Sequence, residues 1–256
     1  MDTENLVLSK CGKSFHYNRS ASTSSKKLES ILSKRYNTEQ CVVVPSGMSA
    51  INNVLQSIIL NSSEQINLFY GNELYCDTPS LIKYFEKIIP NQIKVNVNKP
   101  LTIIKKFEKQ YANQHNVLLF ESCSNPRGYI FDFSIIDTLR KLSKSLCVIV
   151  DNTWLTDVIF NPFEYGANIV VTSLTKYYSG GQAMGGAILG ASEIIEPIRK
   201  YVSRTGVHTS PYNIDIIIKN IDEMENHIIK SSKLTCRTIF IQNRNQIIGM
   251  FLLIFK

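Results

Sequence analysis

A lysine, an acid and two hydroxyl side chains follow two short apolar segments in the middle of the chain. Residues 146–150 and 168–172 are uncharged and rich in β-branched side chains, which is typical of strands buried on both faces of a parallel sheet. In such sheets a ligand binds at the carboxyl ends of the strands. The polar residues that stand at these ends are Asp151, Ser173, Thr175 and Lys176.

A lysine buried at a strand end can act as a nucleophile. Desolvation favours its neutral amine, which attacks an aldehyde and forms a Schiff base. Pyridoxal phosphate (PLP) needs such a lysine for its aldehyde, hydroxyls for its phosphate and a carboxylate that keeps its ring nitrogen protonated. Lys176 and Asp151 match the amine and the acid. A lysine that only caps a strand in solvent has the same spacing, so spacing alone leaves both interpretations open.

The segments around these groups resemble a family signature. DNTW at 151–154 and SLTKYYSGG at 173–181 are similar to the DNT(F/W)…S-x-TKY pattern of the Cys/Met-metabolism PLP enzymes. That family includes the cystathionine γ-synthases, the cystathionine lyases, the methionine γ-lyases and the O-acetylhomoserine sulfhydrylases. The resemblance extends roughly over residues 16–227. It implies an α/β fold of the aspartate-aminotransferase-like, fold type I class, with a mostly parallel sheet flanked by helices.

A second segment resembles the phosphate-binding part of that family. Residues 41–44 read as a short strand, and PSGM followed by SAINNVLQSII reads as a turn and a helix. The amino end of a helix presents free N–H groups and a positive dipole end to an anion. The resemblance implies that Gly47 and Met48 hold the cofactor phosphate together with Ser173 and Thr175.

Two further motifs supply residues for the cofactor ring. In GNELYCDT the resemblance implies that Tyr75 stacks on the ring, and this sequence has Cys76 and Asp77 where the family has two glycines. In ESCSNP it implies that Asn125 hydrogen-bonds the phenolic oxygen of the cofactor. Glu121 in the same motif is expected to orient neighbouring backbone rather than to take part in catalysis.

The segment FHYNR resembles an arm that reaches a neighbouring subunit. In the family a Y-x-R pair at this position contacts the PLP phosphate of the second chain, and Tyr17 and Arg19 match it. An arginine fork and a phenol suit phosphate oxygens. We therefore expect a homodimer that shares its active sites, with a tetramer as a further possibility.

Composition excludes several other classes. The net charge is +7, but the 28 Lys and Arg are dispersed and are not interleaved with aromatics, so nucleic-acid binding is not expected. The six cysteines have no CxxC spacing, which indicates reduced thiols in the cytoplasm rather than a disulfide framework or a metal site. We expect no signal peptide and no membrane span.

Three regions are expected along the chain. Residues 1–36 form an arm and a first helix, 37–212 a large PLP-binding α/β domain, and 213–256 a long helix, from about Tyr212, and the start of a truncated carboxyl-terminal domain. In the family that last domain carries the arginine that binds the substrate carboxylate. Among the expected helices, the patterns place Ser24 as the cap of one over 23–36 and Asn98 as the cap of one over 98–111.

Three functions follow from the resemblance. The first is a PLP-dependent lyase or transferase of trans-sulfuration that performs β- or γ-elimination or γ-replacement on cystathionine, homocysteine or O-acylhomoserine. Lys176 and Tyr75 are its expected catalytic residues, and a small amino acid is its expected substrate. The second is a PLP-binding but inactive or regulatory truncated homologue. The third is a remnant that binds no cofactor.

Overall fold

The computed structural model describes residues 8–11, 14–17 and 22–242, with side chains described over residues 22–231. The main strands are β3 Gln40–Val44, β4 Ile66–Gly71, β5 Gln92–Val95, β6 His115–Glu121, β7 Ser145–Asp151, β8 Ile169–Ser173 and β9 Gly186–Gly190. The α-helices are α1 Thr23–Arg35, α2 Gly47–Asn61, α3 Asp77–Tyr84, α4 Pro100–Lys106, α5 Ile136–Leu142, α6 Thr156–Ile159, α7 Ser192–Thr205 and α8 Pro211–Gln242. Short helical turns are η2 Phe107–Tyr111, η3 Phe133–Ile135 and η4 Pro162–Tyr165, and β1 Leu8–Cys11 pairs antiparallel with β2 Ser14–Tyr17.

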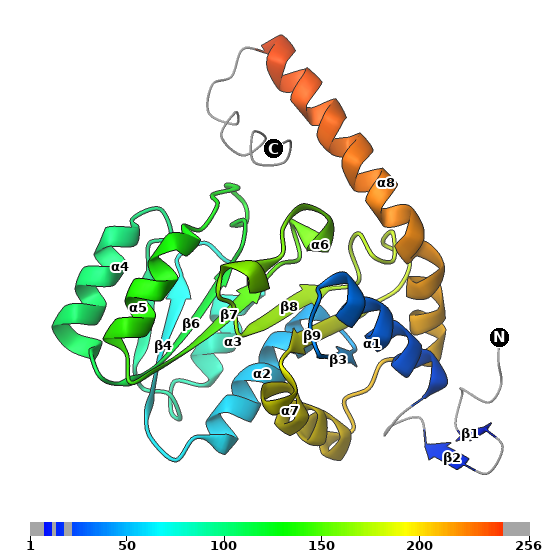
Figure 1. Cartoon of the computed structure of the whole chain (residues 1–256), viewed down its shortest axis with the longest axis horizontal. Helices are drawn as coiled ribbons and strands as arrows, with labels where there is room; N and C mark the ends of the chain where they lie inside the picture. The colour runs from blue at the N-terminus through cyan, green and yellow to red at the C-terminus, as the bar shows by residue number, and fades with distance from the viewer. Residues whose placement is uncertain (1–7, 12–13, 18–21, 243–256) are drawn as a thin grey trace.

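The main strands form one seven-stranded sheet in the order β3-β9-β8-β7-β6-β4-β5 (Figure 1). β9 runs antiparallel to β3 and β8, and the other neighbouring pairs are parallel. The mostly parallel α/β sheet predicted from the sequence is therefore confirmed. Its parallel strands β4, β6, β7 and β8 end at a common edge, which is the place where such sheets bind ligands.

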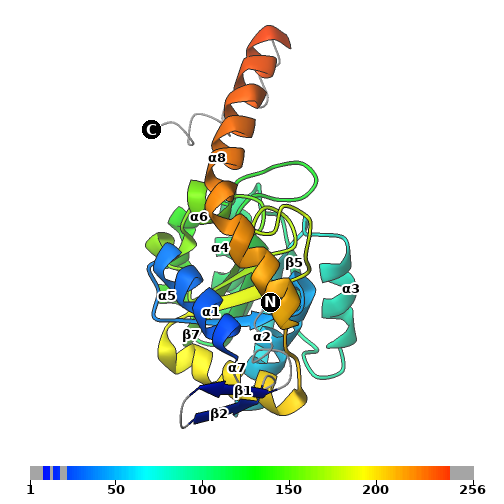
Figure 2. The same ribbon diagram turned by 90° about the vertical axis from the view of Figure 1, so that its right-hand side faces the viewer.

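Helices cover both faces of the sheet, and successive residues of one strand serve opposite faces. In β6, Val117 and Leu119 pack in the core under α2, α3 and α7, whereas Leu118 and Phe120 pack under α4 and α5. A second core on the latter face joins α1 and α8 to β3, β8 and β9. The result is three layers, with the end of α8 projecting beyond them (Figures 1 and 2). Burial on both faces explains why β8, and β7 up to Val150, contain no charged residue.

Helix α2 follows β3 and leads away from the carboxyl edge of the sheet. Its buried side chains Ala50, Ile51, Val54 and Leu55 recur at helical spacing and form the face that packs on the sheet. Ser46 caps the helix by accepting a hydrogen bond from the backbone N–H of Ser49 at 3.0 Å. The amino end of α2 is thereby fixed at the edge where the parallel strands end.

The cap predicted for α1 was wrong by two residues. Ser22 has the extended backbone of an N-cap, and its hydroxyl accepts from the N–H of Ser25 while Ser25 Oγ accepts from the N–H of Ser22, each at 3.0 Å. Ser24 lies inside the first turn, where its hydroxyl donates to Asp215 of α8 at 3.0 Å. It therefore fastens α8 to α1 rather than capping α1.

The cap predicted for the helix over 98–111 was also wrong. Lys99 precedes the first helical residue and makes no side-chain capping bond, and α4 begins at Pro100. A proline at the first helical position loses nothing, because its missing N–H has no partner within the helix there. The helix therefore starts without the asparagine that the sequence pattern suggested.

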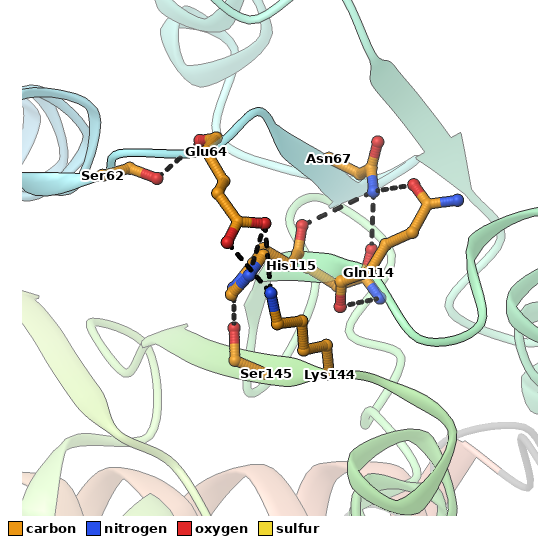
Figure 3. Close-up of polar contacts among 8 residues, drawn as sticks. Ser62, Glu64, Asn67, Gln114, His115, Lys144 and Ser145 are labelled. Carbon is orange, nitrogen blue, oxygen red and sulfur yellow. Dashed lines mark hydrogen bonds and ion pairs between the residues drawn. The ribbon is translucent and has the colours of Figure 1, made fainter.

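The opposite, amino-terminal edge of the sheet carries a polar cluster (Figure 3). Glu64 accepts from Lys144 at 2.9 Å and lies 3.0 Å from Nε2 of His115, whose Nδ1 lies 2.6 Å from the hydroxyl of Ser145. The Glu64 and Lys144 side chains are each more than half exposed, so solvent screens the pair and it contributes little to stability. We interpret this cluster as a surface link between β6 and β7, remote from the carboxyl edge.

Candidate active site

A cavity of about 530 Å³ lies at the carboxyl ends of β6, β7 and β8, beside the amino end of α2. The residues that line it come from segments that are far apart in the sequence. Eight of the ten residues that the sequence suggested as site residues line it together. They are Gly47, Met48, Tyr75, Asn125, Asp151, Ser173, Thr175 and Lys176.

The other two suggested residues belong to the amino-terminal arm. Arg19 lies outside the described residues. Tyr17 is the last residue of β2, opposite Leu8 in the hairpin, and its side chain is not among those described. Their contact with a neighbouring subunit therefore stays a prediction.

Asp151 is oriented by a relay of short hydrogen bonds. Its Oδ1 accepts from the backbone N–H of Thr153 at 3.0 Å and from the hydroxyl of Thr153 at 2.6 Å. That hydroxyl in turn accepts from the backbone N–H of Ser173 at 2.8 Å. Both bonds from Thr153 go to Oδ1, so Oδ2 is the oxygen that Asp151 can offer to a ligand in the cavity.

The environment of Asp151 favours a cationic partner. Burial raises the pKa of Asp151 above its usual value, and the two bonds from Thr153 only partly oppose this. A desolvated carboxyl of this kind is stabilised as an anion when a positive group binds beside it. The position is suited to a protonated nitrogen of a bound ring.

Lys176 lies in a tight turn between β8 and β9. The N–H of Ser179 donates to the carbonyl of Leu174, and the N–H of Gly181 donates to the carbonyl of Lys176, each at 3.0 Å. Thr175 fastens the turn to β9, because its hydroxyl donates to the carbonyl of Gly185 at 3.3 Å and accepts from the N–H of the same residue at 3.1 Å. The hydroxyl of Thr175 is thus engaged within the protein, whereas that of Ser173 makes no hydrogen bond to the described residues.

The amino end of α2 lies directly against the end of β8. A Cβ added to Gly47 would stand 2.9 Å from Cβ of Ser173, and one added to Gly186 would stand 2.2 Å from the carbonyl oxygen of Ser46. Both glycines are needed because the two backbones approach too closely for a side chain. The close approach brings the N–H groups of the helix end and the Ser173 hydroxyl to one place, which suits a phosphate.

We predict that Gly186→Ala destabilises the chain strongly. The new methyl group meets backbone atoms of Ser46, which a rotamer change cannot move away, so the turn that begins α2 has to shift. The matched variant is Gly71→Ala, another strand glycine, whose Cβ would meet a side-chain methyl of Val97 at 3.0 Å. Thermal unfolding should show a larger loss of Tm for Gly186→Ala. Equal losses for the two variants would contradict the argument.

Glu121 joins the two loops that carry Tyr75 and Asn125. Its carboxyl accepts from the backbone N–H of Tyr75 and is also hydrogen-bonded by the backbone of Asn125. The expectation that Glu121 orients neighbouring backbone is confirmed. Burial, together with the nearby charge of Asp151, raises the pKa of Glu121 to about 8.

The raised pKa of Glu121 predicts a pH dependence of stability. The folded chain retains this proton up to about pH 8, whereas the unfolded chain releases it near the ordinary value of 4.5. The protonated Glu121 therefore contributes its full stabilisation of the folded chain below pH 4.5, and this contribution is lost as the pH rises through 8. Glu121→Gln keeps the acceptor for Tyr75 and removes the titration. Thermal unfolding of the cofactor-free proteins should show the Tm of wild type falling relative to Glu121→Gln across this window, and parallel Tm profiles would argue against it.

Eight other lining residues were not predicted as cofactor-binding or catalytic residues: Ser46, Ile51, Glu121, Cys123, Thr153, Trp154, Tyr177 and Met184. Thr153 orients Asp151, and Trp154, Tyr177 and Met184 give the cavity a partly exposed apolar wall. Thr153 and Trp154 stand in the DNTW motif itself, so their position next to Asp151 was a usable signal. Tyr177 directly follows Lys176, but the side to which its ring turns depends on the turn geometry. Met184 had no signal in the sequence, because its place depends on how the loop before β9 folds.

In the described part of the chain, no group of three or more His, Cys, Asp or Glu side chains is arranged to hold a metal ion. None of the described helices combines the length and the apolarity needed to cross a membrane.

Comparison with known proteins identifies the family. Residues 2–238 match the family model described as Cys/Met metabolism PLP-dependent enzyme. The chain belongs to this family. The match spans more than nine-tenths of the chain, so the family resemblance suggested by the two central motifs is confirmed.

Individual members of the family are moderately similar. The chain is 30% identical over 213 residues to a cystathionine beta-lyase of Schizosaccharomyces pombe, which covers 82% of this chain and 53% of that protein. It is 26% identical over 226 residues to an L-methionine gamma-lyase of Treponema denticola, which covers 85% of this chain and 55% of that protein. The chain thus spans about half the length of these relatives.

A solved structure supports the fold. A crystal structure from Campylobacter jejuni that contains N'-pyridoxyl-lysine-5'-monophosphate superimposes with a TM-score of 0.76 at 23% sequence identity. The alignment covers 91% of this chain and 65% of that chain. The fold is the one known for PLP-dependent enzymes of this family, as the resemblance implied.

Proposed function

We propose that the cavity binds pyridoxal phosphate through Lys176 and that the whole protein is a PLP-dependent carbon–sulfur lyase or transferase of trans-sulfuration. The observation that carries the proposal is the convergence of eight motif residues on one cavity at the carboxyl edge of the sheet. Family membership supports the same chemistry. When bound, the cofactor supplies an electron sink for the bonds at the α-carbon of an amino acid.

The residues at the amino end of α2 fit the phosphate of the cofactor. The first turn of this helix has no acidic side chain that would repel an anion. Gly47 and Met48 offer backbone N–H groups there, and Ser173 offers its uncommitted hydroxyl. Thr175 contributes to the same wall, and because its hydroxyl is bound to Gly185, we assign it the role of holding the Lys176 turn.

The residues at the far end of the cavity fit the ring of the cofactor. Asp151 offers Oδ2 to a protonated ring nitrogen and keeps the proton on that nitrogen. Tyr75, which is 38% exposed, offers its ring face for stacking, and Asn125 offers its amide to the phenolic oxygen. Glu121 holds the backbones of Tyr75 and Asn125 in place.

Lys176 has two tasks in this proposal. Its amine holds the cofactor aldehyde covalently until a substrate amine replaces it. Once released, the same amine can accept a proton from the α-carbon of the substrate and deliver it to another substrate carbon, because the turn keeps it in the cavity. The apolar wall of Trp154, Tyr177 and Met184 suits the thioether part of a substrate such as cystathionine.

A turnover experiment tests the proposed reaction. The full chain, loaded with pyridoxal phosphate, is incubated separately with cystathionine, methionine and an O-acylhomoserine plus a thiol. Elimination from cystathionine releases a thiol, an oxo acid and ammonia in equal amounts, and replacement on the O-acylhomoserine consumes the thiol and releases the acyl group. We expect one of these reactions to proceed faster with the loaded protein than with free cofactor alone. Cofactor binding without any turnover would favour the PLP-binding, inactive alternative.

The partners and the compartment are also proposals. We propose an amino acid as substrate and a homodimer in which the arm of residues 1–36, with Tyr17 and Arg19, reaches the phosphate site of the second chain. Residues 37–212 then form the cofactor-binding unit. The described thiols of Cys41 and Cys147 form no disulfide, which agrees with the reducing cytoplasm.

A further inference from the structure

A buried hydrogen-bond network lies behind the cavity and is not part of the cofactor site proposed above. It consists of Tyr36 at the end of α1, Asn152 after β7, Asp157 in α6 and Tyr178 in the Lys176 turn. The side chains of Tyr36, Asn152 and Tyr178 are fully buried. The hydroxyls of Tyr36 and Tyr178 lie 3.2 Å apart, and Tyr178 donates to Asp157 at 2.5 Å.

Donor and acceptor chemistry fixes the direction of this network. The amide nitrogen of Asn152 donates to the hydroxyl of Tyr36 at 3.2 Å. Since the hydroxyl proton of Tyr178 is directed to Asp157, Tyr36 donates to Tyr178. Arg35 donates to the other oxygen of Asp157 at 2.6 Å, so the chain of bonds ends on a paired carboxylate. Burial and the nearby carboxylate raise the pKa of both tyrosines, so both remain protonated donors.

The network includes residues that lie close to Asp151 and Lys176 in the sequence. Asn152 directly follows Asp151, and its amide oxygen accepts from Ser122 at 2.7 Å while its nitrogen also donates to the carbonyl of Phe160 at 2.8 Å. Tyr178 stands two residues after Lys176, in the turn that carries the lysine. One connected set of bonds therefore ties the strand end that presents the acid to the turn that presents the amine.

The backbone beside Asp157 is held in an uncommon conformation. Thr156 has a φ of 56°, in the left-handed region that β-branched residues rarely adopt. Such a conformation persists only where the surroundings over-determine it. The bonds of Asp157 to Arg35 and Tyr178 supply that constraint from two different elements.

We propose that Tyr178, Asp157 and Tyr36 are positioning residues that fix the Lys176 turn relative to Asp151. This inference rests on the proposed function, because it assigns the network to the two ends of the cofactor site. Removing the Tyr178 hydroxyl leaves the fully buried Tyr36 hydroxyl without its acceptor and leaves Asp157, whose side chain is 5% exposed, with one partner fewer. The turn can then move without unfolding the sheet. The distance between the Lys176 amine and the Asp151 carboxyl then no longer suits a cofactor that both groups have to contact.

The test compares Tyr178→Phe and Asp157→Asn with the control Tyr84→Phe, which alters a tyrosine that is 85% exposed. Each full-length protein is titrated with pyridoxal phosphate, and the rate of covalent capture by borohydride is measured at saturating cofactor. We expect both network variants to bind the cofactor about tenfold more weakly or worse, as when partners that orient the ligands of a bound group are lost. Capture should also be slower, and the double variant should lose no more than the worse single variant, because the residues act as one unit.

Other outcomes separate the two proposals. If wild type captures the cofactor and the network variants match its affinity and capture rate while their Tm falls, the network is only structural and this inference fails alone. If wild type captures none, the proposed function fails and this inference fails with it. Should both network variants fail to fold, Tyr36→Phe is tested by the same two measurements. In that variant Asn152 keeps its hydrogen bond to the carbonyl of Phe160, and Tyr178 keeps its hydrogen bond to Asp157. Wild-type binding by Tyr36→Phe would then overturn the inference.

Discussion

Lys176→Ala is expected to abolish covalent capture of pyridoxal phosphate and to lower turnover by at least about a thousandfold, on the scale that loss of a covalent catalyst produces. The turn of Lys176 is held by backbone bonds of Leu174, Ser179 and Gly181, so an alanine leaves it folded. The phosphate and ring contacts remain, and the cofactor can still bind without a covalent bond. The measurements are the visible absorbance of the loaded protein before and after borohydride and the rate of substrate turnover.

The control for this variant is Lys144→Ala. Lys144 is more than half exposed and pairs with Glu64 at the opposite edge of the sheet (Figure 3). We expect it to retain wild-type capture and turnover. Full capture by Lys176→Ala would show that the covalent bond forms at another lysine, and equal loss in the two variants would show that the loss is not specific to Lys176.

Asp151→Asn is expected to lower the turnover of the cofactor-loaded protein but to raise the Tm of the cofactor-free protein. An asparagine oxygen keeps the bonds from Thr153 but carries no charge, so a ring nitrogen bound there loses the anion that keeps it protonated. Turnover should fall by about 10²–10³-fold, the usual loss when one charge-stabilising group is removed. The cofactor should still be captured on Lys176.

The free protein should gain stability from the same substitution. Burial raises the folded pKa of Asp151 above its unfolded value, so stability is lost as the pH rises through the folded pKa. An uncharged asparagine avoids that loss. The Tm of cofactor-free Asp151→Asn should exceed that of wild type at neutral pH and approach it in acid. A lower Tm at neutral pH would mean that the carboxylate is stabilised by a partner in the free protein.

The strands were predictable because both of their faces are buried. Residues 146–150 and 168–172 contain no charge, and the observed β7 and β8 differ from them by only one residue at each end. Helix caps were less predictable, because several polar residues compete for each. Three serines stand near the start of α1, and the backbone conformation of Ser22 decides which of them caps.

The candidate site was predictable where residues follow strand ends. Asp151, Ser173 and Lys176 stand at fixed offsets from buried strands, so a parallel sheet alone brings them to one edge. The Tyr36–Tyr178 contact spans 142 residues and had no sequence signal. It exists because α1 packs on the same face of the sheet as the Lys176 turn, and only the assembled fold specifies that contact.

Peptide mapping after borohydride reduction identifies the lysine that binds the cofactor. The wild-type protein is mixed with one equivalent of pyridoxal phosphate, reduced and digested, and the modified lysine is identified by mass spectrometry. We predict that the modification lies on the peptide that contains Lys176, because this amine lies in the cavity with Asp151 and the phosphate-binding helix end. Modification spread over the surface lysines, with Lys176 unmodified, would contradict the account.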